Sequence, residues 1–196
     1  TQLETKRKDS TQASRYGELM HDTMRAIRSC RHPVVVRIKG LCVGGALELA
    51  LGCDLRIAGE SSRFGIPISR LGLVMAHPEI EMLVSVVGPA VALEILYEGR
   101  VFNAAEAKEK GLINKVVPDN QLDAAVAETV DCICNGAPLV NRWHKKFVYG
   151  LVDIAGENKE WTAAQIAEGF ACFDTEDYRE GIRAFLAKEI PDFQGK

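Results

Sequence analysis

Apolar residues recur every three or four positions between Ser10 and Cys30, with Tyr16, Met20 and Met24 among them. This spacing places their side chains on one face of an amphipathic helix. His32 is followed by Pro33, and the residue before a proline is disfavoured in helical conformation. The pattern therefore predicts a helix over residues 10–30.

A different pattern follows the proline. Residues 34–38 form a short, mostly β-branched run, which is typical of a buried strand. A second apolar run at 41–43 leads directly into Gly44-Gly45, and residues 46–51 are helix formers. The sequence predicts a strand, a glycine pair and a helix in immediate succession.

The rest of the first 118 residues predicts further alternation of strands and helices. The helix ends are marked by three kinds of signal: prolines that suit a first helical turn, a capping pair of Asn and Glu, and a closing glycine. We expect strands at 54–58, 63–67 and 113–117, and helices after Pro78, after Pro89 and from Asn103 to Gly111.

The pattern changes after Pro118. Helical periodicity covers four later segments and no convincing strand lies between them: 121–135, 138–154, 159–173 and 176–188. The sequence therefore predicts an α/β part over residues 1–118 and an all-helical part over 119–196.

Composition narrows the class of protein. The chain has 196 residues, is 47% hydrophobic and carries a net charge of −3, with no run of five or more like charges, so we expect no nucleic-acid partner. No apolar run reaches the about 18 residues that span a membrane, and a cytoplasmic protein is expected. The six cysteines have no paired CxxC spacing, and no metal site is predicted.

The glycine pair carries candidate chemistry. The first amides of a helix have no partner within the helix, and glycine lets an oxygen approach them closely. Glu48 follows within the first turn, so its carboxylate projects toward the same end. This arrangement can bind a developing oxyanion beside an acid or base; the alternative is a glutamate that only complements the helix dipole.

These segments resemble a known family. Residues 32–54, HPVVVRIKGLCVGGALELALGCD, resemble the signature of the enoyl-CoA hydratase/isomerase (crotonase) family, where a K-P-V-I-A-A-V-N-G-like strand precedes a G-G-G-x-E-L-A-x-x-C-D-like helix. Residues 63–67, 99–107 and 173–188 resemble later segments of that family in the same order. The resemblance covers residues 15 to 193.

The resemblance implies a fold and a function. The fold is a crotonase (ClpP-like) spiral of β-β-α units, here without its N-terminal part, followed by a helical C-terminal region that joins subunits into a homotrimer or a dimer of trimers. The function is hydration or double-bond isomerisation of an enoyl-CoA through a stabilised thioester enolate. Coenzyme A arrives as part of the acyl-CoA substrate, and no separate cofactor is required.

The resemblance also assigns residues. Gly45 matches the glycine whose amide donates to the thioester oxygen, with Gly44 beside it in the substrate site. Glu48 matches one of the two family carboxylates that exchange protons. Lys188 matches a lysine that contacts the nucleotide end of CoA; its other interpretation is an ordinary solvent-facing lysine.

The sequence departs from the family pattern where the second carboxylate is expected. That position is Ile68, which cannot transfer a proton, and this puts two-carboxylate hydration in doubt. Arg70 could pair with the first carboxylate or contact a substrate. His77, Glu79 or Glu81 could supply the missing group from a shifted position, and the alternative is that they are exposed capping residues.

A second departure concerns the start of the chain. In relatives another oxyanion amide comes from an A-G-x-D-like loop before the helix at 10–30, and no such motif occurs here, so we expect a further N-terminal region. The alternatives are another acyl-CoA reaction, such as hydrolysis or decarboxylation, or a non-catalytic CoA-binding or assembly subunit. A serine peptidase of this fold is disfavoured because Ala46 and Leu47 follow the glycines.

Overall fold

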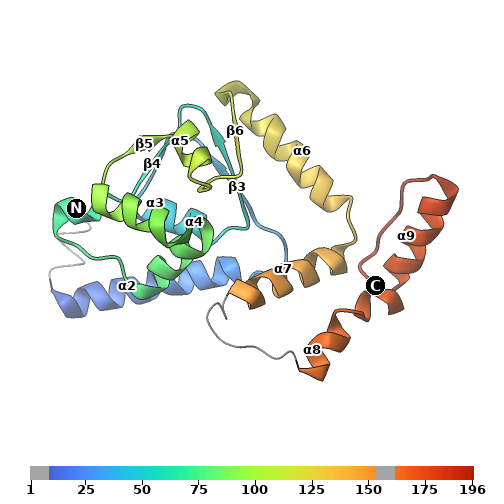
Figure 1. Ribbon diagram of the computed structural model, residues 1–196. Coiled ribbons are helices and arrows are strands. Elements are labelled where there is room, and N and C mark those ends of the chain that lie inside the picture. Colours follow the sequence, from blue (N-terminus) through green and yellow to red (C-terminus); the bar gives the residue numbers. More distant parts are fainter. Residues whose placement is uncertain (1–8, 153–161) are drawn as a thin grey trace. The chain divides into compact units, whose positions relative to one another are not determined.

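The computed structural model describes residues 9–152 and 162–196 (Figure 1). The chain forms two compact units. The first holds the described residues up to 126 apart from 31–33, and the second holds 31–33 and the described residues from 127 onward. The first unit is α/β and the second is helical, while the predicted division of the chain at residue 118 stays a prediction.

Two small sheets form the centre of the first unit. One is entirely parallel, as expected for buried, β-branched strands, and pairs Ile38 with Ala58 and Ile57 with Lys115. The other joins one parallel and one antiparallel pair. In spatial order the first sheet contains β1 (Val35–Ile38), β3 (Leu55–Gly59) and β6 (Lys115–Val117), and the second contains β2 (Leu41–Val43), β4 (Arg63–Gly65) and β5 (Phe102–Asn103).

The short helix α3 packs against two longer helices. It follows β2 directly and contacts both α2 and α4. The elements are α2 (Ser10–Arg28), α3 (Gly45–Leu51), α4 (His77–Glu98), α5 (Ala104–Glu109) and the 3-10 turns η1 (Pro67–Leu71) and η2 (Asp119–Gln121).

Burial of apolar side chains holds this arrangement together. Leu47 of α3, Phe64 of β4 and Leu83 of α4 are all fully buried and belong to one core cluster. Each such side chain contributes about 1.5–3 kcal/mol relative to an exposed position. The helix that carries the predicted site is therefore fixed by the core.

A buried arginine fixes the far end of α3. Arg56 of β3 donates from Nη1 to the carbonyl oxygens of Cys53 (2.6 Å) and Ala50 (3.4 Å), and from Nε to the carbonyl oxygen of Leu112 (2.9 Å). A guanidinium at a helix C-terminus satisfies the last carbonyl groups and complements the helix dipole. Arg56 thus links α3, the parallel sheet and the segment after α5.

The long helix α4 contains a break. Gly88 has φ 74° and ψ 167°, and Pro89 follows it, so two helical segments meet at a kink. This matches the sequence prediction of separate helices after Pro78 and after Pro89. By length and composition α4 is apolar enough to cross a membrane; within the described chain, Leu83 and Ile95 are among its residues that pack in the core.

The second unit consists of helices. Its helix α8 is shorter than the helix predicted over 159–173. The helix ends at Glu168 because Gly169 follows and the chain then tightens into a 3-10 turn. Residues 159–161 of the predicted helix lie outside the described residues. The helix α6 (Leu122–Cys134) begins in the first unit and continues into the second. The later elements are α7 (Pro138–Val152), α8 (Ala163–Glu168), η3 (Ala171–Asp174) and α9 (Glu176–Ala187).

The last described residues fold back along α9 (Figure 1). The buried side chain of Asp177 accepts hydrogen bonds from the amides of Gln194 (2.7 Å) and Gly195 (2.9 Å). The Asp177 amide in turn donates to the carbonyl oxygen of Lys196 (3.1 Å). One buried carboxylate therefore organises this end of the helical unit.

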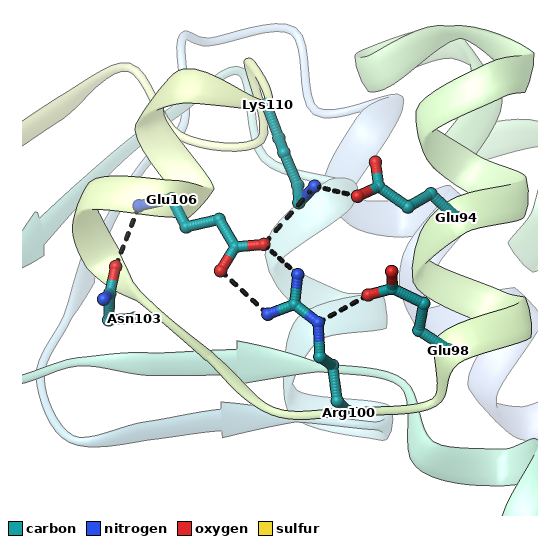
Figure 2. A network of polar contacts seen from close by, with 6 residues as sticks. All are labelled: Glu94, Glu98, Arg100, Asn103, Glu106 and Lys110. Atoms are coloured by element: carbon teal, nitrogen blue, oxygen red, sulfur yellow. Dashed lines mark hydrogen bonds and ion pairs between the residues drawn. The ribbon is translucent and has the colours of Figure 1, made fainter.

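An ion-pair network joins the end of α4 to α5 (Figure 2). Arg100 forms a two-pronged pair with Glu106 and also contacts Glu98, while Lys110 donates to Glu94 at 2.7 Å and lies 3.4 Å from Glu106. Hydrogen bonding to Arg100, with a smaller effect from Lys110, lowers the pKa of Glu106. The network is therefore most stabilising when Glu106 is ionised.

Replacing Glu106 with glutamine is expected to lower the melting temperature at neutral pH. Because the folded-state pKa lies below the usual 4.5, this stabilisation is present above pH 4.5 and is lost as the pH falls through the folded value. Thermal unfolding followed by circular dichroism should show the wild-type and variant curves converging in acid. Glu109→Gln, at an exposed position of the same helix, is the control. A difference in melting temperature between the wild type and Glu106→Gln that stays constant with pH would contradict the prediction.

Candidate active site

A cavity of about 550 Å³ lies in the first unit. Three elements line it: the face of α2 from Ser10 to His21, Glu48 of α3, and the segment from Ile68 to Glu79. Apolar side chains such as Met20 and Leu73 share the lining with these ionisable groups. A pocket of this size and mixed character suits a small organic group held beside a few reactive side chains.

The burial pattern of α3 sets the position of Glu48. Leu47, Ala50 and Leu51 are buried, so one face of this short helix is occupied by the core, and Glu48 lies half-buried at the edge of that face. A methyl group built on Gly45 would lie 3.8 Å from Glu48 Oε2 and 3.7 Å from Met20 Cε. The Glu48 carboxylate therefore lies beside the first residue of its own helix, as the sequence predicted.

Backbone geometry explains the glycine pair. Gly44 has φ 57° and ψ −127°, a conformation that is essentially restricted to glycine. Its amide donates to the Gly65 carbonyl (2.9 Å), and its own carbonyl accepts from the amides of Leu47 (2.8 Å) and Glu48 (3.0 Å). Gly45 starts the helix after this turn, so its amide has no acceptor within the helix.

A histidine–glutamate pair lines the same cavity. His21 Nε2 and Glu79 Oε1 are 3.0 Å apart, and their side chains are only 17% and 13% exposed. The other carboxylate oxygen, Glu79 Oε2, accepts the amide hydrogen of Ala76 (2.7 Å) at the start of α4. Both oxygens of Glu79 are thus engaged by fixed partners.

The structure separates the residues singled out from the sequence. Ile68 lines the cavity as an apolar residue. Arg70 at the end of η1 and His77 at the start of α4 are exposed and do not belong to the lining. Lys188 is an exposed residue with φ 57° that caps α9 in the helical unit. Of the three groups considered in place of Ile68, Glu79 is the one that faces the cavity.

Sequence reasoning did not find His21. It sits beside Met20 on the face of α2 that turns toward the cavity, and the amphipathic pattern alone marks such a position as part of a packing face. Its partner Glu79 is 58 positions away in the chain. The pairing depends on the tertiary fold, and a single sequence contains no local signal for it.

No metal centre is found among the described residues, since no three His, Cys, Asp or Glu side chains gather there in a group that could hold an ion. The polar groups at the cavity include Glu48 and the His21–Glu79 pair.

Sequence comparison identifies the family. The sequence model of the enoyl-CoA hydratase/isomerase family matches residues 1–196. The chain belongs to this family of enzymes. A crotonyl-CoA hydratase from Syntrophomonas wolfei is 34% identical over 188 residues, which cover 94% of this chain and 70% of that relative. Enoyl-CoA hydratase EchA19 from Mycobacterium tuberculosis is 33% identical over 189 residues, which cover 96% of this chain and 70% of that relative.

Solved structures agree with this assignment to the enoyl-CoA hydratase/isomerase family. The crystal structure of an enoyl-CoA hydratase/carnithine racemase from Magnetospirillum magneticum superposes with a TM-score of 0.94 at 44% identity, over 100% of this chain and 72% of that one. The crystal structure of an enoyl-CoA hydratase/isomerase family protein from Hyphomonas neptunium superposes with a TM-score of 0.92 at 32% identity. This match covers 100% of this chain and 73% of that one. The crotonase fold predicted from the sequence is confirmed.

Replacing Gly44 with alanine is expected to destabilise the protein by about 1–3 kcal/mol, because the side chain forces the turn before α3 into a strained conformation. Urea unfolding followed by fluorescence measures the change. Gly150→Ala is the matched control, since Gly150 lies within α7 with open space around the added methyl group. Equal stability of the Gly44 and Gly150 variants would contradict the proposed constraint.

Proposed function

We propose that this protein activates the thioester carbonyl of an enoyl-CoA and that Glu48 serves as the acid and base in its hydration or double-bond isomerisation. The observation that carries this proposal is the proximity of the Glu48 carboxylate to the start of α3, beside a cavity of about 550 Å³. The names of the relatives, among them a crotonyl-CoA hydratase, support the substrate class.

The proposed chemistry follows from the electronic structure of the substrate. When water adds to the β-carbon of a conjugated thioester, or when a base removes an α-proton, negative charge develops on the thioester oxygen. The Gly45 amide supplies a hydrogen bond to that oxygen, and one such donor typically changes the rate by about 10²–10³. Glu48 accepts the proton that is released, which typically contributes a factor of about 10²–10⁴.

Both reactions remain within the proposal because Ile68 offers no proton. Isomerisation needs a single base that removes an α-proton and returns it to the γ-carbon, and Glu48 alone is sufficient for that cycle. Hydration also needs a proton source for the α-carbon. A CoA-binding subunit without activity is the remaining alternative, and it predicts binding of acyl-CoA with no turnover.

The other assigned residues have supporting roles in this proposal. Gly44 shapes the turn that presents the Gly45 amide, and Ile68 contacts the acyl chain from the cavity wall. Arg70 and His77, both exposed, would contact the polar CoA portion, which carries phosphates. The family resemblance separately assigns to Lys188 a contact with the nucleotide end of CoA. Coenzyme A is part of the substrate, and the chemistry requires neither a metal nor a separate cofactor.

The helical region over 119–196 is proposed to join copies of the chain into a homotrimer or a dimer of trimers. Large apolar side chains along its C-terminal helices support this, because extended exposed apolar surface is typical of a subunit interface. Phe170, Phe173, Phe185, Leu186 and Ile190 are each more than half exposed in the isolated chain. Cytoplasmic location and the absence of a membrane or nucleic-acid partner stay predictions from composition.

Replacing Glu48 with glutamine keeps the size and hydrogen-bonding capacity of the side chain but removes its basicity. We expect kcat/KM for crotonyl-CoA hydration or vinylacetyl-CoA isomerisation to fall by about 10²–10⁴. The conjugated thioester is followed by its ultraviolet absorbance. Glu60→Gln, on an exposed loop between β3 and β4, should match the wild type, and equal activity of the Glu48 variant would exclude this role.

Replacing Gly45 with alanine tests the oxyanion donor separately from folding. The added methyl group meets its neighbours at ordinary contact distances of 3.7 and 3.8 Å, so stability should change by no more than about 1 kcal/mol. The methyl group occupies the approach to the amide, and kcat should fall by about 10²-fold. A variant with unchanged stability and unchanged kcat would place the oxyanion donor elsewhere.

A further inference from the structure

The His21–Glu79 pair has the features of a proton-transfer unit. Its two side chains come from different helices, α2 and α4, and are brought together at the wall of the cavity that Glu48 also lines. Glu79 is held at both oxygens, by His21 at 3.0 Å and by the Ala76 amide at 2.7 Å. A histidine oriented by a fixed carboxylate is the arrangement that general acid–base catalysis requires.

The hydrogen-bond pattern indicates which nitrogen exchanges a proton. An ionised carboxylate accepts hydrogen bonds at both oxygens, and Glu79 already accepts one from the Ala76 amide. With Glu79 ionised, the hydrogen shared with His21 belongs to Nε2. This leaves the other nitrogen, Nδ1, for proton exchange, since Glu79 is the one polar partner of His21 among the described residues.

Hydration moves two protons at two different atoms, one from water and one to the α-carbon. Glu48 can serve only one of these positions at a time, and Ile68 cannot serve either. We propose that His21 is the second proton-transfer residue of this site and that Glu79 is its positioning residue. This inference rests on the proposed function.

The resulting step is balanced in atoms and charge. Water bonds through its oxygen to the β-carbon and gives a proton to the Glu48 carboxylate, while the electrons of the double bond move to the thioester oxygen. The resulting enolate then takes a proton at the α-carbon from Nδ1 of protonated His21. Afterwards the proton on Glu48 returns through water to His21, so that one molecule of water has been added.

A purely structural pair that ties α2 to α4 is the competing interpretation. It predicts that loss of the pair lowers stability and leaves the proton chemistry of the folded protein unchanged. Exchange of the α-proton of butyryl-CoA with D₂O separates the two interpretations, because this saturated thioester can neither add nor lose water. Exchange reports on the group that serves the α-carbon alone.

The experiment uses the full chain and follows crotonyl-CoA hydration by absorbance and butyryl-CoA exchange by proton NMR. We expect His21→Gln to lower both rates by about 10²–10⁴, whereas Glu48→Gln loses hydration and retains exchange. His144→Gln, which removes an exposed histidine of α7, should leave both rates unchanged. A wild type that isomerises vinylacetyl-CoA and does not hydrate crotonyl-CoA overturns this inference and leaves the proposed function intact.

Two further measurements address positioning and folding. Glu79→Gln should lower kcat with little change in KM, because the substrate still binds while His21 is no longer oriented. Free imidazole should restore exchange to His21→Ala and should not restore hydration to Glu48→Gln. These readouts depend on the proton-transfer group, and a structural contact would not change them.

The outcomes separate the two proposals. If the His21 and Glu79 variants hydrate and exchange at the same rates as the wild type, this inference is overturned and the proposed function stays intact. Lower thermal stability of these variants with unchanged exchange also overturns it. A wild-type protein that turns over neither enoyl thioester refutes the proposed function itself, and the assignment of His21 falls with it.

Discussion

The turn at Gly44 is the constraint on which the candidate site depends. Its positive φ lets the chain pass from β2 into α3 within one residue, and its amide and carbonyl groups are both used, by Gly65 on one side and by Leu47 and Glu48 on the other. No other amino acid adopts this conformation without strain. Because the polar groups of Gly44 are satisfied, the next amide in the chain becomes the first donor that a ligand can use.

Most of the fold could be predicted because its elements carry local signals. The strand–glycine–helix junction, the break at Pro89 and the capping pair of Asn103 and Glu106 each follow from a few neighbouring residues. The helix expected over 159–173 was too long, since apolar periodicity continued past Gly169 although the chain tightens there. Periodicity measures which side of a helix is apolar and does not mark where the helix stops.

The candidate site could be predicted only where it is local. Gly45 and Glu48 are three residues apart on one helix, so their proximity follows from helical geometry. His21 and Glu79 meet because α2 and the start of α4 face the same cavity. The sequence offered His77, Glu79 and Glu81 together. His77, the first residue of α4, is exposed, whereas Glu79 projects back toward the helix start, where it reaches both Ala76 and His21.

The two ends of α3 are anchored by different means. Arg56 holds the carbonyl groups at one end from inside the protein, far along the helix from the glycine turn at the other. A side chain that lines the cavity can therefore change while Arg56 keeps the other end of the helix joined to the sheet. A scaffold of this kind lets new chemistry be acquired by substitutions around a cavity while the cost to folding stays small, which is one physical basis for diverse reactions on a common framework.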